Sequence, residues 1–80
     1  MARITFFEEA PHSTGTAHPT QVGCEWKVFD HLGVRYLQLD TFGSHHRENP
    51  GRQSQTIQLD RDNAAQLAVI IAQAFPPGRA

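Results

Sequence analysis

The run RDNAAQLAVIIAQAF at residues 61–75, followed by PPG at residues 76–78, restricts the fold of this chain more than any other feature. Its apolar residues recur at helical spacing, and the prolines and glycine predict that a helix ends there. Asp60 precedes the run and is predicted to be the N-cap. One apolar stripe is formed by Ala64, Leu67, Ala68, Ile71, Ala74 and Phe75, and outside it lie Val69 and Ile70. One sheet does not cover a surface this wide, so a symmetric homodimer is expected.

The small size of the chain supports the same expectation. Eighty residues fit one domain, and a domain of this size buries a limited share of its surface. The single cysteine, Cys24, excludes an intrachain disulfide and fits a reducing compartment. The predicted dimer interface consists of Leu67, Ile70, Ile71 and Phe75. No signal peptide or membrane span is recognisable, so a soluble, cytoplasmic protein is expected.

Two short runs with a turn between them predict a β-hairpin. CEWKVFD and VRYLQLDTF are rich in β-branched and aromatic residues, and HLG separates them. Alternation along VRYLQLDTF directs Leu37 and Leu39 to the core and mixes aromatic and polar groups on the opposite face. SQTIQLD predicts a third strand, which leads directly into the helix.

The N-terminal part of the chain is organised differently. RITFFEE, residues 3–9, predicts a strand or an adhesive arm, and residues 10–21 are rich in Pro, Gly, Ser and Thr, as expected of a flexible connector. We therefore divide the chain into an arm plus connector at residues 1–22, a core at 23–75 and a tail at 76–80.

Residue types for metal binding and catalysis occur without the spacing that such sites need. A zinc site could draw on five histidines and a cysteine, but no CxxC, HxxxH or HExxH pattern accompanies them. Ser44, His45 and Asp40 are the residue types of a hydrolytic triad, yet no nucleophile turn such as GxSxG is present. We expect no enzyme activity, no metal and no cofactor.

The order of these elements resembles a known family. A hairpin whose second strand ends in an aromatic residue is followed by a polar loop closing in PGR, and QTIQLD then leads into a capped helix. This arrangement over residues 23–75 resembles the transcriptional coactivator family called positive cofactor four and its bacterial single-stranded-DNA-binding relatives. The resemblance implies an α+β fold, with a four-stranded antiparallel sheet and one C-terminal helix, that dimerises through the helices. It also implies binding of single-stranded DNA or, less favoured, RNA, with little sequence specificity, in transcription or DNA metabolism.

In that family, basic and aromatic side chains hold the nucleic acid on the strands and in the loop before the last strand. Carried over to this sequence, the nucleic-acid-binding candidates are Trp26, Lys27, Arg35, Tyr36, Phe42, Arg47 and Arg52. Aromatic rings stack on bases, and Lys or Arg neutralises phosphates without reading sequence. Trp26 and Phe42 could instead pack within the hairpin.

This chain departs from the family in charge. It has seven Lys plus Arg against eight Asp plus Glu, a formal net charge of −1, whereas family members are usually richer in lysine. A face with few cations predicts modest affinity and a shallow salt dependence. Two other functions therefore stay open. One is a protein-interaction module that uses Ile4, Phe6 and Phe7, and the other is a ribbon-helix-helix repressor, which would need a second helix.

Overall fold

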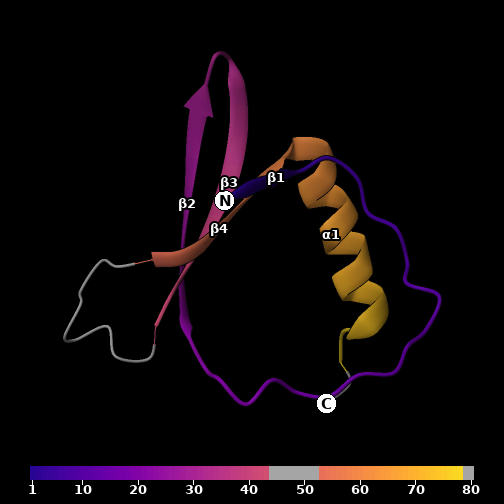
Figure 1. Ribbon diagram of the computed structural model, residues 1–80. Coiled ribbons are helices and arrows are strands. Elements are labelled where there is room, and N and C mark those ends of the chain that lie inside the picture. The colour runs from indigo at the N-terminus through magenta and orange to yellow at the C-terminus, as the bar shows by residue number, and fades with distance from the viewer. Residues whose placement is uncertain (44–52, 79–80) are drawn as a thin grey trace.

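The computed structural model describes residues 1–43 and 53–78 and shows an α+β arrangement. Its elements, drawn in Figure 1, are β1 (Ala2–Ile4), β2 (Gly23–His31), β3 (Val34–Phe42), β4 (Gln53–Asp60) and α1 (Arg61–Ala74). The predicted hairpin, third strand and single C-terminal helix are thus confirmed.

The sheet is mixed, and the expectation of a fully antiparallel sheet is wrong. Its strand order is β1-β4-β3-β2, in which β2, β3 and β4 pair antiparallel and β1 runs parallel to β4. β1 occupies the edge of β4 that β3 leaves open, and Ile4 pairs with Leu59 there. The predicted strand at residues 3–9 is shorter in the structure and ends at Ile4, which pairs with Leu59, one residue before the end of β4.

The hairpin turn consists of two residues. His31 pairs with Val34, and both residues between them have positive φ angles, 52° for Leu32 and 80° for Gly33. Two positive φ angles define the tight turn whose twist matches that of paired strands. This turn fixes the register of β2 against β3, so that Phe29 faces Tyr36 and Val28 faces Leu37.

The sheet has two chemically different faces. The leucine face carries Val28, Leu37, Leu39, Ile57 and Leu59, and α1 packs on it against β3 and β4. Sheet and helix meet in a cleft of about 270 Å³, lined on this face by residues that include Val28, Leu37, Leu59 and Ala64. The opposite side, here called the open face, carries the alternate residues of each strand.

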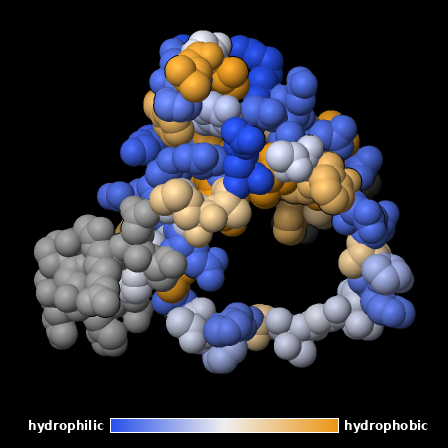
Figure 2. Space-filling model, turned by 45° about the horizontal axis from the view of Figure 1, so that its top comes forward, coloured by the Kyte–Doolittle hydropathy of each residue, from blue (hydrophilic) through white to orange (hydrophobic). Residues whose placement is uncertain are grey.

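The buried core is small. Among the described residues, Leu59 is the one buried hydrophobic side chain, 1% exposed, and its burial contributes about 1.5–3 kcal/mol to folding. The radius of gyration is 15.0 Å, whereas a compact domain of this length has about 12 Å. α1 runs away from the sheet, and the connector arches around an opening (Figures 1 and 2).

Asp60 caps the helix as predicted. Its Oδ1 atom accepts hydrogen bonds from the backbone N–H of Asn63 at 3.0 Å and from the Asn63 side chain at 2.9 Å. The backbone bond first, and then the side-chain bond, hold the pKa of Asp60 below its usual value. The cap therefore stabilises the fold in full above the ordinary carboxyl pKa, and this stabilisation is lost as the pH falls towards the lower pKa of the folded state.

We expect Asp60→Ala to lower the melting temperature by about 4–8 °C at neutral pH, because the N–H of Asn63 loses its acceptor. The difference between wild type and variant should shrink as the pH falls below about 4. Thermal unfolding followed by circular dichroism measures both effects. Asp60→Asn, which retains an acceptor, is the control, and a difference independent of pH would contradict the assignment.

Candidate nucleic-acid interface

Side chains on the open face form rows that cross the sheet. Strand pairing places Arg3 beside Gln58, Gln58 beside Gln38, and Gln38 beside Lys27. This row spans all four strands and ends in a cation on each side. With about 4.8 Å between neighbouring strands, the Cα atoms of Arg3 and Lys27 lie roughly 14 Å apart.

The next row towards the hairpin turn holds two stacked aromatic rings. The ring centroids of Phe29 and Tyr36 are 5.6 Å apart, with an angle of 29° between the planes. Lys27 Nζ lies 5.8 Å from the centroid of Phe29, and Arg3 Nη1 donates a long hydrogen bond of 3.4 Å to the Tyr36 hydroxyl. Both rings are partly buried and both cations are exposed. An aromatic pair with a cation at each end can take a base on its π-face and phosphates on either side.

A chain of hydrogen bonds lies next to the cluster formed by Arg3, Lys27, Phe29 and Tyr36. Gln58 Nε2 donates to Gln38 Oε1 at 2.8 Å, and Gln38 Nε2 donates to both carboxylate oxygens of Asp40 at 3.0 Å. The hydroxyl of Thr56 donates to Asp40 Oδ1 at 2.6 Å. The bond from Thr56 and then those from Gln38 lower the pKa of Asp40, and the charge of Lys27 adds a smaller effect. Asp40 is therefore ionised at neutral pH and accepts every bond it makes here.

Phe42 also lies on the open face, at the far end of the hairpin. It pairs with Gly23, and a Cβ atom at Gly23 would overlap the ring of Phe42. The missing side chain of Gly23 thus makes room for the ring, which is only partly exposed. The contact of Phe42 with nucleic acid stays a prediction.

Two other candidates, Trp26 and Arg35, lie on the leucine face. Trp26 pairs with Leu39 and is 69% exposed, whereas Lys27, its neighbour along β2, is on the open face. Arg35 pairs with Asp30 and forms an ion pair with it, with Nε at 3.0 Å and Nη2 at 3.4 Å from the two carboxylate oxygens. The sheet therefore separates these two side chains from Lys27, Tyr36 and Phe42.

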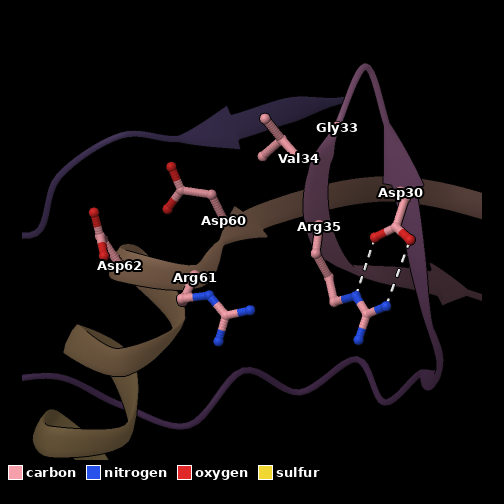
Figure 3. A pocket seen from close by; sticks show the side chains of 7 residues that line it. All are labelled: Asp30, Gly33, Val34, Arg35, Asp60, Arg61 and Asp62. Atoms are coloured by element: carbon pink, nitrogen blue, oxygen red, sulfur yellow. Dashed lines mark hydrogen bonds and ion pairs between the residues drawn. The ribbon is translucent and has the colours of Figure 1, made fainter.

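A charged cleft surrounds Arg35 (Figure 3). It has a volume of about 670 Å³ and lies between the hairpin turn and the start of α1, lined by Asp30, Gly33, Val34, Arg35, Asp60, Arg61 and Asp62. Its three carboxylates outnumber its two guanidinium groups, and one of these, that of Arg35, is paired with Asp30. Such a cleft is a poor site for phosphate.

The two remaining nucleic-acid candidates, Arg47 and Arg52, lie outside the described residues, as do His45 and His46 of the loop. Within residues 1–43 and 53–78, no three of the His, Cys, Asp and Glu side chains come together as a metal site. In the same residues, no helix has the length and apolar character that a membrane span requires.

The predicted dimer residues are distributed around α1. Leu67 is partly buried, whereas Ile71 is 51% and Phe75 is 76% exposed. Ile70 is 40% exposed and belongs to a groove that the N-terminal arm shares with the helix. The residues that line this groove are Phe7, Glu8, Glu9, Gln66, Ile70, Gln73 and Ala74. Val69 is 56% exposed as well, so apolar surface remains uncovered on several sides of α1.

Two members of the aromatic cluster were missed in the sequence. Phe29 could have been found, because a two-residue turn at Leu32 and Gly33 places it opposite Tyr36. Arg3 carried no such signal, since its place beside Gln58 depends on β1 pairing with a strand more than 50 residues later.

In comparisons with protein-family models, with curated proteins and with solved structures, nothing matches this chain.

Proposed function

We propose that this protein is a homodimer that binds single-stranded nucleic acid on the open face of its sheet, and that this nucleic acid is DNA, with RNA as the alternative. The observation that carries the proposal is the cluster of Arg3, Tyr36, Phe29 and Lys27, in which two stacked rings lie between two exposed cations. Double-stranded DNA keeps its bases stacked inside the helix, so aromatic side chains that stack on bases favour a single strand.

In this proposal, the electrostatic contact between the protein and the phosphate backbone of the nucleic acid is weak. Lys27 and Arg3 are the basic groups of the cluster, and Glu25 and Asp40 lie on the same face. Each neutralised phosphate contributes a salt-dependence slope of about −0.7 for single strands, so two phosphates give roughly −1.4 per subunit. Affinity therefore depends on base stacking more than on charge.

The exposed apolar surface of α1 supports the dimer. Ile71 and Phe75 are more than half exposed, and the leucine face beneath the projecting helix leaves Trp26 and Val28 uncovered, with 69% and 51% exposure. An isolated chain would expose these groups to water at a considerable cost. A second copy that packs its helix here would cover them and set two open faces beside each other.

We expect a labelled single-stranded thymidine oligonucleotide to bind in fluorescence-anisotropy titrations, and a duplex of the same length to bind more weakly. Lys27→Ala should weaken binding several-fold and make the salt dependence shallower, because one phosphate contact is lost. Arg61→Ala removes a cation of the charged cleft at the start of α1 and serves as the matched control.

Equal effects of Lys27→Ala and Arg61→Ala would move the binding site away from the open face. Failure of the wild-type chain to bind either DNA or RNA at low salt would remove the proposal altogether. The interaction module would then be favoured, because Phe6 is 71% exposed on the N-terminal arm and lies in no strand. Ile4 and Phe7 are partly buried and are less accessible to a partner.

A further inference from the structure

The side chains along one side of α1 change from small to large. Residues three or four apart are neighbours on a helix, so one row runs along Ala64, Ala68, Ile71 and Phe75. Phe75 is the C-cap residue, and its backbone N–H donates to the Ile71 carbonyl oxygen at 2.8 Å, which continues the helical hydrogen bonding. We call these four residues the graded row. Its first two side chains are methyl groups, and its last two are a branched chain and an aromatic ring.

The small end of the graded row borders an apolar cleft. This is the cleft of about 270 Å³ between the sheet and the start of α1, and Ala64 forms part of its wall. Val28, Leu37 and Leu59 line it from the leucine face. An apolar cavity of about 150 Å³ already holds a benzene molecule, so an aromatic ring fits into this cleft. Val28 is 51% exposed in the single chain, so part of the apolar lining is in contact with water.

The large end of the graded row is exposed and lies far from this cleft. Ile71 is 51% and Phe75 is 76% exposed, and α1 ends away from the sheet (Figure 1). Phe75 follows Ala64 by 11 residues, or about 16 Å along the helix axis. Phe75 therefore does not reach the cleft of its own chain. Phe75 of a second copy reaches it when the two helices run in opposite directions.

An antiparallel pair of helices matches large side chains to small ones along the whole graded row. A two-fold axis between Ala68 and Ile71 sets Ile71 of each chain against the partner's Ala68, and Phe75 against the partner's Ala64. A parallel pair would instead set Phe75 against Phe75 and Ala64 against Ala64, with a gap at the small end. Well-packed protein interfaces leave few voids, so the antiparallel pair is favoured.

The polar groups of the cleft suit an aromatic occupant. Arg35 and Arg61 line it together with the apolar side chains, and guanidinium groups pack favourably on aromatic rings. Asp60, the carboxylate in the cleft, accepts two hydrogen bonds from Asn63. A ring that enters the cleft leaves these two bonds in place and removes apolar side chains from water.

We propose that Phe75 of each subunit inserts into the cleft beside Ala64 of the other, in a homodimer whose two α1 helices pack antiparallel. The cleft between sheet and helix is thus a binding site for a second copy of this chain. This inference rests on the homodimer of the proposed function, and it adds the direction of the two helices and the side chain that joins each subunit to the other.

Disulfide trapping tests the direction of the helices. In a Cys24→Ser background, Ala64→Cys and Phe75→Cys together should give a covalent dimer on oxidation, detected by non-reducing gel electrophoresis. The two thiols of one chain are about 16 Å apart and form no bond with each other, since a disulfide needs Cα atoms within about 7 Å. Either substitution alone should give no covalent dimer, because identical positions lie about 16 Å apart across the antiparallel pair.

The Phe75→Ala variant tests the contact without any added cysteine. It should raise the dissociation constant of the dimer at least about tenfold in analytical ultracentrifugation, because the partner's cleft loses its occupant. Phe75 is 76% exposed in the single chain, so each chain keeps its fold. Val69→Ala shortens an apolar side chain outside the graded row and is the matched control, with a change of at most about twofold expected.

A covalent dimer from either single-cysteine variant would overturn the inference, and so would a folded double-cysteine variant that gives none. A Phe75→Ala variant that dimerises as tightly as the wild type would overturn it as well, and this result decides if the double-cysteine variant does not fold. In each case the wild-type chain is still a dimer, and the proposed function stands. A monomeric wild type would instead contradict the homodimer of the proposed function.

Discussion

The Ile71→Asp variant is expected to be a monomer under conditions in which the wild-type chain is a dimer. Ile71 is 51% exposed in the single chain, although it follows Leu67 by one helical turn on the side of α1 that begins against the sheet. In the dimer a partner helix would cover it. An unpaired carboxylate buried at that position costs about 3–5 kcal/mol, which raises the dissociation constant at least a hundredfold.

Val69→Asp is the matched control for this experiment. Val69 is 56% exposed and lies on the same helix, but two residues away, where side chains point to different sides. The predicted interface does not include it, so this variant should remain a dimer. Light scattering coupled to size-exclusion chromatography over a range of concentrations measures both variants. A monomeric wild type would contradict the dimer, and equal effects of the two variants would place the interface elsewhere on α1.

If the proposed function holds, the oligomeric state should also determine how strongly the open face binds nucleic acid. Each chain has one aromatic pair and few cations on this face, so a single open face would make a weak contact. Two open faces in one dimer would hold the same strand with an effective concentration that raises the affinity by orders of magnitude. We therefore expect Ile71→Asp to weaken binding of a long single strand much more than binding of a short one.

The elements that the sequence predicted correctly are those that nearby residues in the chain determine. Two residues with positive φ fix the hairpin, Asp60 caps the helix, and Pro76 follows the C-cap residue Phe75. The parallel pairing of β1 with β4 has no local cause. It joins residues 2–4 to residues 57–59, and a three-residue strand leaves no alternation from which its partner or direction could be read.

The faces on which the candidate residues lie could be predicted from the sequence only in part, for a similar reason. Residue type identified Lys27, Tyr36 and Phe42, which the structure places on the open face. The same reasoning included Trp26 and Arg35, although alternation along the strands directs both to the leucine face. Residue type alone does not separate two faces of a sheet; register does, because side chains opposite each other across two strands point the same way.

We expect Phe29→Ala to weaken binding of single-stranded DNA by about 5- to 150-fold, the range for loss of one base–aromatic stack of about 1–3 kcal/mol. The ring of Phe29 stacks on Tyr36 and lies beneath the ammonium group of Lys27, so its removal disrupts the centre of the cluster. Affinity measured by fluorescence anisotropy should fall at every salt concentration, with the salt slope nearly unchanged, because no phosphate contact is removed.

The Trp26→Ala variant distinguishes base stacking on the open face from nonspecific binding to any exposed aromatic ring. Trp26 is on the same strand and is 69% exposed, more than Phe29, but it faces the other way. If any accessible ring sufficed, Trp26→Ala would weaken binding at least as much as Phe29→Ala. If the open face binds the strand, Trp26→Ala should leave affinity within about twofold of wild type, provided that light scattering shows the variant to be a dimer. Because the two side chains project from opposite faces of one strand, the ratio of their effects locates the nucleic acid on one side of the sheet.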